Sequence, residues 1–298
     1  MNLATITLFC RERFRLDAWR HYVDEYQDGI ALHVIVNNGD PADTELLKER
    51  FPDSMVLESP TSNMMASYNL ALKEILKHPE IDAIGQIVND IRIEDGGIRK
   101  LYDILFGQVD CFAVSPVLLE KDSDVIDCFG CAVNRKTFQF VHLDAGASLA
   151  EVPIETKQVD ALPAGVFIAK RTFYERYGIQ DEALNMYADE IDMALRVRKA
   201  GLRMTASSEI RAWHQHVNAS GRPQRNARAA YLMGRNAVYL AGKHVSSWRR
   251  LVVFLYHVYR GIDEFRSALF HGKRDGSYAF GQAIICGAWD GLFYRAQS

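Results

Sequence analysis

The chain has 298 residues, 48% of them hydrophobic and 24% charged, a composition typical of a globular protein with one large core or two domains. Its formal net charge of −3 excludes a general nucleic-acid-binding protein, which would be strongly basic. The N-terminal residues lack the pattern of a secretory signal, and the longest apolar runs fall well short of the ~18 residues of a membrane span. We therefore expect a cytoplasmic protein that does not bind nucleic acid.

The five cysteines are few and odd in number, as expected for a protein in a reducing compartment. Cys128 and Cys131 form a single C-x-x-C motif. A structural zinc site needs four ligands and the sequence contains no second pair, so we expect two buried thiols here rather than a zinc site.

Strands and helices alternate over the first 120 residues. We expect strands at 4–9, 31–36, 54–59, 81–88 and 110–119, and helices at 11–27, 42–51, 64–77 and 95–106, the third capped by Asn63. This alternation predicts an open, mostly parallel α/β sheet flanked by helices. Ligands bind such sheets beyond the carboxyl ends of the strands, so the turns after Cys10, Val36 and Val88 are the places to look for chemistry.

The pattern weakens between residues 120 and 160, where loops or antiparallel strands are expected. A strand-turn-strand, a helix from near Arg171 and a helix at 187–201 follow, and a last strand and loop occupy 204–221. From residue 222 the sequence is helical, with aromatic residues and arginines interleaved. We expect a catalytic domain at 1–222 and a helical C-terminal region at 223–298.

Three carboxylates, Asp189, Glu190 and Asp192, begin the helix at 187–201, which ends in basic residues before Gly201. Acidic residues in the first turn, basic residues in the last turn and glycine after the end complement the helix dipole and the C-cap. A solvated acidic turn and a catalytic carboxylate cluster both fit this pattern.

Asp90 follows the strand at 81–88, and a carboxylate in such a place suits Mg²⁺ or Mn²⁺ that bridges two phosphates. Asn-Asp turns are also common without any metal. His214 and His216, after the last strand, can complete a metal site because imidazole also suits Mn²⁺.

Taken in order, these segments resemble the inverting GT-A glycosyltransferases of family 2, in particular bacterial rhamnosyltransferase-like members. VIVNNGD resembles that family's V-x-V-D-N-G-S turn, ASYNLALKEI its N-x-G-x-x-x-A segment, and IVNDIRIEDGGIRKLYDIL its D-x-D region with the helix that follows. Residues 160–204 match the family's long central motif almost register for register. AWHQHVNASG and RNAVYL resemble the histidine loop and the R-N segment that follow it.

The resemblance implies the GT-A fold and a nucleotide-diphosphate sugar as donor, of the dTDP-rhamnose or UDP-hexose type. It places the donor and its nucleotide at Phe9, Arg11, Arg13, Asn37, Asn69, Asn89, Asp90 and Gly165. It implies a divalent cation, Mn²⁺ or Mg²⁺, bound by Asp90 and by His214 or His216. Glu190 or Asp189 would be the catalytic base, and Asp192 and Tyr187 would form the acceptor pocket.

Several positions depart from the family's pattern. Asn37 replaces the Asp that usually faces the nucleotide, and the D-x-D region keeps only Asp90. The family's Glu-Asp pair is reversed as Asp189-Glu190, which leaves the base open between the two. The histidine loop is slightly longer than expected, which leaves the metal ligand open between His214 and His216.

The implied acceptor is a hydroxyl of a glycan or of a polyprenyl-linked glycan, in the synthesis of a cell-surface polysaccharide. Aromatic and basic residues of the C-terminal helices, among them Trp248, Arg249 and Tyr259, predict either peripheral contact with the inner face of a membrane or packing, including packing in a homodimer. Two alternatives remain at this point. A nucleotidyltransferase would normally have a Gly-rich phosphate loop after the first strand, where FCRERFRLD has no glycine. A non-catalytic sugar- or partner-binding protein would explain the departures.

Overall fold

The computed structural model describes residues 1–215, 226–270 and 277–294. These residues form two compact units. Unit 1 consists of residues 1–132, 142–181 and 196–215, and unit 2 of residues 133–141, 182–195 and the described residues from 226 onward. The domain boundary predicted near residue 222 lies outside the described residues and stays a prediction.

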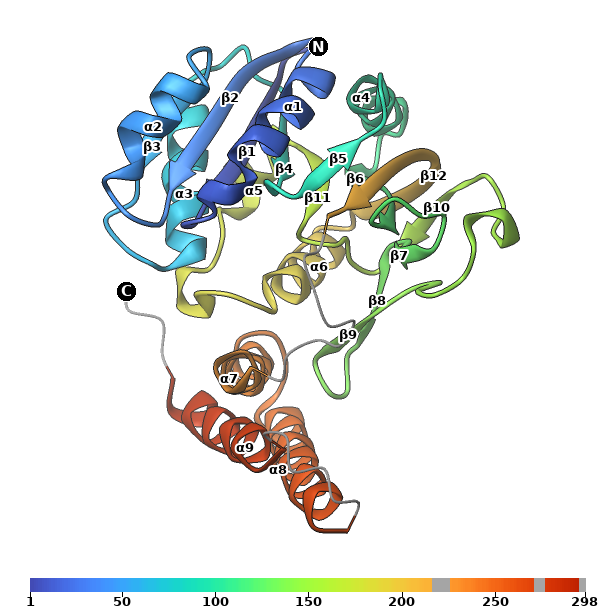
Figure 1. The fold of residues 1–298 in the computed structure, drawn as a ribbon. Helices are drawn as coiled ribbons and strands as arrows, with labels where there is room; N and C mark the ends of the chain where they lie inside the picture. The colour runs from blue at the N-terminus through green and yellow to red at the C-terminus, as the bar shows by residue number, and fades with distance from the viewer. Residues whose placement is uncertain (216–225, 271–276, 295–298) are drawn as a thin grey trace. The chain divides into compact units, whose positions relative to one another are not determined.

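A large sheet is the centre of unit 1 (Figure 1). Its strand order is β10-β12-β6-β11-β4-β1-β2-β3, with β5 paired to β12 and β7 paired to β6, while β8 and β9 form a separate hairpin. The strands are β1 (Leu3–Phe9), β2 (Ile30–Asn37), β3 (Met55–Glu58), β4 (Ala83–Ile87), β5 (Ile91–Ile93), β6 (Cys111–Glu120), β7 (Ile126–Cys128), β8 (Cys131–Asn134), β9 (Gln139–His142), β10 (Thr156–Val159), β11 (Val166–Lys170) and β12 (Arg203–His214).

The sheet is parallel in one half and mixed in the other. β1 is parallel to both β2 and β4, and β3 is parallel to β2. β11 is antiparallel to β4 and to β6, whereas β12 is parallel to β6. The predicted open, mostly parallel α/β sheet is therefore confirmed, with β11, in the middle of the sheet, antiparallel to both of its neighbours. The carboxyl ends of β1, β2 and β4 meet at one edge, where a ligand is expected.

The helices form where the sequence places them. They are α1 (Leu16–Tyr26), α2 (Asp43–Arg50), α3 (Met64–Ile75), α4 (Gly97–Gly107), α5 (Arg171–Tyr177), α6 (Asp189–Lys199), α7 (Ala227–His244), α8 (Ser247–Phe270) and α9 (Ser277–Phe293). The Asn63 side chain accepts a hydrogen bond from the Ala66 amide at 3.2 Å, which confirms the predicted cap of α3. Gly201 has φ +71° just beyond α6, as predicted for its C-terminal end.

The core of unit 1 is built on apolar strands and on the buried stripe of α1. All seven residues of β1 are buried. Trp19 of α1 packs between Phe9, at a ring-centroid distance of 6.0 Å, and Phe51, at 4.3 Å. All three rings are at most 1% exposed, so this cluster fixes α1, and with it the turn that follows β1, against the sheet.

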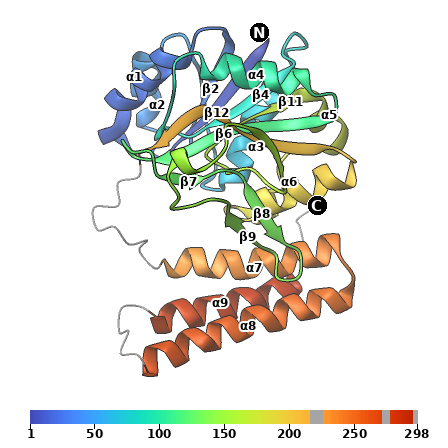
Figure 2. The same cartoon turned by 90° about the vertical axis from the view of Figure 1, so that its right-hand side faces the viewer.

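Unit 2 contains α7, α8 and α9, and α9 packs against both of the other two (Figure 2). The helices approach closely where glycine removes the side chain. A Cβ at Gly287 of α9 would lie 2.1 Å from the carbonyl oxygen of Tyr231 in α7, so no other residue fits there. None of the described helices has an apolar stretch long enough to cross a lipid bilayer.

Candidate functional site

A cluster of three side chains in unit 1 joins two predicted site residues to one that the sequence did not reveal. Nδ1 of His214 lies 3.0 Å from Oδ2 of Asp127, and Nε2 of the same ring lies 3.6 Å from Oδ2 of Asp90. All three side chains are between 15% and 25% exposed. The predicted pair of Asp90 and His214 is therefore brought together in the structure, with the ring held between two carboxylates.

Strand pairing explains why these residues meet. His214 is the last residue of β12 and stands opposite Ile91 of β5, the residue after Asp90. The backbone amide of Gln215 also donates to the Asp90 carbonyl at 2.8 Å. Asp127 comes from β7, which pairs with β6, the parallel neighbour of β12. Three strand ends thus deliver one imidazole and two carboxylates to the same place.

The hydrogen bond from His214 to Asp127 determines which ring nitrogen is available. A carboxylate at Nδ1 favours the tautomer with its proton on Nδ1, which leaves the Nε2 lone pair directed toward Asp90. Metal-binding histidines are commonly oriented in this way by a carboxylate at the other nitrogen. One carboxylate oxygen and one imidazole nitrogen form a donor set that suits Mn²⁺, with oxygen atoms of a ligand or of water in the other positions. The residues present therefore fit a divalent cation.

Asp90 also has a basic neighbour that the sequence analysis missed. Nη1 of Arg15 lies 2.9 Å from Oδ2 of Asp90, the same oxygen that faces His214. Arg15 belongs to a 3₁₀ turn (Arg13–Arg15) just before α1. Next to Asp90, the Asn89 side-chain amide donates to Glu12 at 2.8 Å. A cation that binds Asp90 would compete with this guanidinium for one oxygen.

The other residues predicted for the nucleotide differ in how accessible they are. Phe9 is fully buried, whereas Arg11 is exposed with φ 61°. Arg13 is ion-paired with the buried carboxylate of Asp43. Asn37 is 2% exposed; its amide nitrogen donates to the Asp40 carbonyl at 2.7 Å and to the hydroxyl of Thr44 at 3.0 Å.

The structure gives Asn37 and Asn69 clear structural tasks. Besides the donated bonds, the carbonyl oxygen of Asn37 accepts from the Gly39 amide at 3.0 Å, so the whole side chain holds the turn after β2. Asn69 of α3 is 1% exposed and makes a reciprocal pair with the backbone of Gln180, with both bonds at 2.9 Å. Both side chains are engaged in internal hydrogen bonds, and their contact with a nucleotide stays a prediction.

Gly165 lies in the turn before β11. Its carbonyl accepts a hydrogen bond from the Val88 amide at 2.9 Å, and the side chain of Gln86 donates to the Ala164 carbonyl at 2.6 Å. These bonds hold the turn against the carboxyl end of β4, next to Asn89 and Asp90. A Cβ at Gly165 would meet its nearest neighbours only at ordinary contact distances of 3.7 Å.

The acidic residues that begin α6 belong to unit 2 and have unequal environments. Asp189 is 7% exposed, and burial raises the pKa of its carboxyl group to about 6; the neighbouring Asp192 carboxylate also raises it. A hydrogen bond with the Glu190 side chain acts in the opposite direction and lowers it. Glu190 is only half-buried. A carboxyl group with a pKa near 6 can exchange its proton close to neutral pH, as general-base catalysis requires.

Asp192 is neutralised by two bases from the end of α7. Lys243 Nζ and His244 Nε2 lie 2.9 Å and 2.7 Å from the same carboxylate oxygen of Asp192, which is 1% exposed. A buried carboxylate without such partners would be costly, so this triad ties α6 to α7. The predicted role of Asp192 in the acceptor pocket stays a prediction.

The loop that leads into α6 has an unusual backbone held by α7. Asn185, Tyr187 and Ala188 all have φ between 62° and 66°, a region that residues other than glycine rarely adopt. The Asn236 side chain donates to the carbonyls of Met186 and Tyr187, both at 2.8 Å, and to that of Leu184. The R-N segment that the sequence analysis noted thus fixes the entry to the acidic helix.

Arg235 supports the same loop. One of its guanidinium nitrogens donates to the carbonyls of Ala183 and Leu184, both at 2.9 Å, and to the side chain of Asn236 at 2.7 Å. The residue is 7% exposed, and its charge is placed among carbonyl oxygens. The helical context of Arg235 and Asn236 in the sequence indicates a structural role for the pair. Its hydrogen-bond partners at 183–187 could not be predicted, because no sequence motif marks them.

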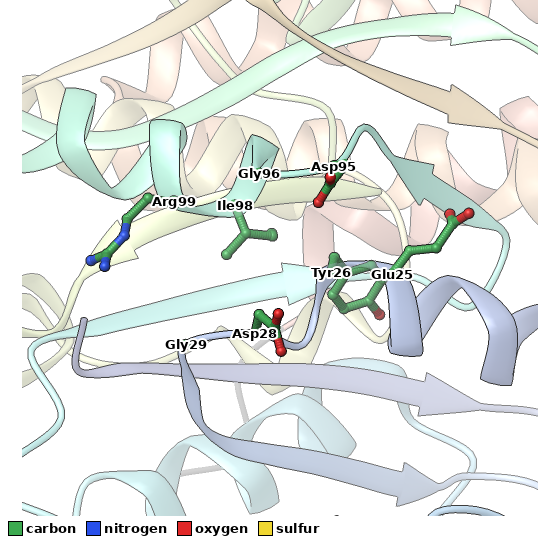
Figure 3. Close-up of a pocket in the computed structure, with 8 residues that line it drawn as sticks. All are labelled: Glu25, Tyr26, Asp28, Gly29, Asp95, Gly96, Ile98 and Arg99. Carbon is green, nitrogen blue, oxygen red and sulfur yellow. The ribbon is translucent and has the colours of Figure 1, made fainter.

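One predicted metal ligand lies beyond the described residues, and one cavity of unit 1 lies away from the predicted site. His216 lies outside the described residues, so its part in metal binding stays a prediction. A cavity of about 340 Å³ near α1 and α4, lined by Glu25, Asp28, Asp95 and Arg99 among others, involves none of the predicted site residues. Figure 3 shows that its residues come from the end of α1 and the turn after it, and from the turn before α4 and the first residues of α4.

Comparison with known proteins defines the class of fold. No protein-family model and no curated protein matches the sequence. Among solved structures the chain is similar to a GT-A glycosyltransferase, so it has the GT-A fold. That structure is the crystal structure of GalNAc-T7 with UDP, GalNAc and Mn²⁺, with a TM-score of 0.65 and 11% sequence identity. The match covers 98% of this chain and 56% of the other, so this chain spans little more than half the length of GalNAc-T7.

Proposed function

We propose that the protein is an inverting glycosyltransferase that moves a sugar from a nucleotide-diphosphate donor to a hydroxyl group of an acceptor. The observation that supports this most directly is the Asp90–His214–Asp127 cluster, which offers one carboxylate oxygen and one oriented imidazole nitrogen beside the carboxyl end of β4. The GT-A fold is the second support, because the solved structure with this fold holds UDP and Mn²⁺.

On the donor side, Asp90 and His214 are the residues that would hold a divalent cation. Such an ion would neutralise the charge that grows on the departing diphosphate. Asp127 fixes the tautomer and the orientation of His214. Arg15, already beside Asp90, is placed to stabilise diphosphate oxygens when the donor occupies the site. We assign the nucleotide to the turns after β1 and β2, where Arg11 is exposed.

On the acceptor side, we assign Glu190 as the general base. We assign Asp189, hydrogen-bonded to Glu190, the role of influencing the proton affinity of that base. In direct displacement the acceptor hydroxyl attacks the anomeric carbon, the sugar–diphosphate bond breaks, and the hydroxyl proton passes to a carboxylate. Glu190 is half-buried and hydrogen-bonded to Asp189, whose pKa of about 6 allows the pair to exchange a proton near neutral pH. Asp189 itself is the other candidate for the base. Attack opposite to the leaving group inverts the anomeric configuration.

The finer assignments rest on the sequence resemblance alone. These are membership of family 2, a rhamnosyl or hexosyl donor, and a glycan or polyprenyl-linked glycan acceptor in polysaccharide synthesis. Peripheral contact with a membrane from the cytoplasmic side, or homodimer formation, is supported by an apolar stripe on α8. It comprises Trp248, Leu251, Val252, Leu255, Tyr259 and Ile262, which are 39–70% exposed.

A second candidate function is a nucleotide-sugar-binding protein without turnover. It is favoured by the ion pair between Arg15 and Asp90, because a guanidinium at the metal-binding oxygen can take the place of a metal in binding a diphosphate. Such a protein would bind a nucleoside diphosphate without metal and would release no product.

A thermal-shift series tests the proposal. UDP, dTDP, GDP and CMP would each be added with and without Mn²⁺ to the wild type, to Asp90→Asn, and to Asp103→Asn as a control in an exposed residue of α4. A ligand at a hundred times its dissociation constant stabilises by about 2.7 kcal/mol. We expect a metal-dependent shift with one nucleoside diphosphate in the wild type and the control, but not in Asp90→Asn.

The identified donor sugar would then be offered with glycan acceptors, and the anomeric configuration of the product determined by NMR. Inversion supports the proposal, and retention contradicts it. A shift without metal and without any product supports the binding protein. No shift with any nucleotide contradicts both functions.

A further inference from the structure

A second group of metal-ligating side chains lies at the base of the β8–β9 hairpin. One ligand atom each from Cys128, Cys131 and His142 lies within 4.8 Å of the others. Both cysteines are 0% exposed, whereas the His142 side chain is 38% exposed. Both cysteines are buried, as predicted, but His142 lies beside them, which a single C-x-x-C motif does not reveal.

The distance between the two sulfur atoms discriminates between chemical states. The two Sγ atoms are 3.6 Å apart. A disulfide requires about 2.05 Å. Two thiolates bound at about 2.3 Å to a tetrahedral Zn²⁺ lie about 3.8 Å apart, close to the observed spacing. Two thiols in van der Waals contact have a similar spacing. The choice between a free thiol pair and a metal site therefore depends on the third ligand, His142.

The turn between the cysteines is built for this spacing. Gly130 has φ +78°, and a Cβ there would lie 2.4 Å from a methyl group of Val159, so only glycine fits. The amide of Phe129 donates to the Leu143 carbonyl at 3.0 Å, and the amide of Leu143 donates to the Gly130 carbonyl at 2.9 Å. These two bonds fasten the turn between the cysteines to the backbone of the residue after His142.

The hydrogen bond of His142 leaves it in a metal-binding state. Its Nδ1 lies 3.1 Å from the backbone carbonyl of Asp127, and the ring can only donate to that oxygen. A proton on Nδ1 leaves the lone pair on Nε2, and metal-ligating histidines commonly make this bond to a backbone carbonyl. The exposed edge of the ring gives solvent access, so an ion can enter and a water molecule can provide a fourth ligand.

We propose that Cys128, Cys131 and His142 form a site for Zn²⁺, in which two thiolates and one imidazole bind the ion and solvent supplies the fourth ligand. Thiolate and imidazole ligands together select zinc among the common divalent ions, whereas the Asp90–His214 pair suits a harder ion. Binding requires both thiols to lose their protons, so two protons are released to solvent for each ion bound. The site does not depend on the proposed glycosyl transfer.

The position of the site gives the metal a structural consequence. Asp127 precedes Cys128, its carbonyl accepts from His142, and its carboxylate accepts from His214. An ion that fixes Cys128 and His142 therefore also fixes the backbone of the residue that orients His214. Loss of zinc would loosen the end of β7 without removing any group that touches a donor.

The test uses the full-length protein, reduced, freed of metal with a chelator and then titrated with Co²⁺ and Zn²⁺. Cobalt bound to thiolates gives sulfur-to-metal charge-transfer absorbance in the near ultraviolet, which a carboxylate–histidine site cannot give. We expect this absorbance to saturate at about one Co²⁺ per chain and to be displaced by Zn²⁺. Zinc content of protein purified without chelator, measured by mass spectrometry of the elements, is the second readout.

The variants separate this site from the rest of the chain. Cys131→Ser should abolish the absorbance, and His142→Asn should weaken binding about 10–100-fold or more. Cys111→Ser is the matched control, because Cys111 is an equally buried thiol of unit 1 outside the cluster, and Asp90→Asn controls for the other site. Both should keep the full signal.

Absence of charge-transfer absorbance in reduced wild-type protein would overturn the proposal. So would a Cys128–Cys131 disulfide that resists reductant, or full binding by His142→Asn.

Discussion

The two units treat their carboxylates in opposite ways. In unit 1, Asp90 is ion-paired with Arg15 and faces the ring of His214. In unit 2, Asp189 is buried beside a second carboxylate, and the pKa of its carboxyl group rises to about 6. Asp192, also in unit 2, has basic partners among the described residues, as Asp90 does and as Asp189 does not, because Lys243 and His244 contact its carboxylate. The same kind of side chain thus has a positively charged partner in one place and lies buried beside another acid in the other.

The difference corresponds to two chemical tasks. A carboxylate binds a cation in its ionised form, and a nearby positive charge favours that form. A carboxylate that accepts a proton from a hydroxyl group must be able to hold that proton, and burial next to another acid makes this possible. Pairs of acids whose environments differ in this way mark candidate ligand-binding and acid–base roles.

The largest effect is expected from Glu190→Gln. Replacing the proposed base removes its proton-accepting oxygen but keeps its shape, so turnover should fall about 10²–10⁴-fold while donor binding remains. Steady-state rates and the thermal shift with the nucleoside diphosphate measure the two quantities separately. Glu182→Gln, an exposed glutamate of the same unit, is the control and should keep its rate. Near-normal turnover by folded Glu190→Gln would transfer the role of base to Asp189.

Asp189→Asn should change stability in a pH-dependent way. The folded-state pKa of about 6 lies above the model value of 3.8, so the folded protein binds more protons than the unfolded chain between these values. The free energy of unfolding therefore falls as the pH rises through this window. The amide cannot ionise, so the free energy of unfolding of the variant should exceed that of the wild type by about 1–3 kcal/mol near pH 8. This difference should vanish near pH 4.

Denaturant unfolding at several pH values measures this difference. Asp181→Asn serves as the matched control, because Asp181 is a half-buried carboxylate near the same loop. An advantage of Asp189→Asn that is equal at pH 4 and pH 8 would show that burial does not hold the carboxyl group near pH 6. The same variant should lose turnover if Asp189 tunes the base, so gain of stability and loss of activity together mark its functional role.

Much of the fold could be predicted from sequence patterns, because helix caps, helix ends and buried strands depend on residues close together in the chain. The helix of α3 with its cap at Asn63, the end of α6 at Gly201 and the buried strand β1 were all predicted correctly. The antiparallel direction of β11 was not, since strand direction depends on which distant strands pair, and an apolar run reads the same in either direction.

The candidate site was predictable to a smaller extent. Asp90 and His214 were chosen from the sequence and lie together in the structure. Asp127 and Arg15 were missed, because each is a single charged residue without a motif and only strand pairing or a 3₁₀ turn brings it to Asp90 or His214. Asn236 was seen as part of a motif, but its task, holding a strained loop, is visible only in its hydrogen bonds.

Asn236→Ala should loosen the entry to α6. The change removes the side-chain donor to the carbonyls of Met186 and Tyr187, whereas the Leu184 carbonyl keeps Arg235; carbonyls left without partners cost about 1–3 kcal/mol. Because residues with positive φ are held there against their preference, we also expect turnover to fall more than donor affinity. Asn226→Ala is the matched control: it removes the N-cap of α7, which costs about 1 kcal/mol, and leaves the loop bonds in place.

Unfolding free energies and the ratio of kcat to KM measure both parts of this prediction. If Asn226→Ala and Asn236→Ala lower stability and turnover in the same proportion, the loop has no role of its own. A selective loss of kcat in Asn236→Ala assigns it as a positioning residue for the acidic end of α6.

The smallest effect is expected on the unit 1 side, from Arg15→Gln. The guanidinium contacts the Asp90 oxygen that faces His214, so removing it should raise the affinity of the free protein for Mn²⁺ about 2–10-fold, the size of a partly exposed ion pair. The affinity for the nucleoside diphosphate should fall at the same time, because a diphosphate contact is lost. Arg20→Gln, whose ion pair with Asp24 lies elsewhere on α1, should change neither. Calorimetric titration with Mn²⁺ and then with nucleotide distinguishes the cases: weaker Mn²⁺ binding by Arg15→Gln would mean that Arg15 orients Asp90 for the metal rather than competing with it.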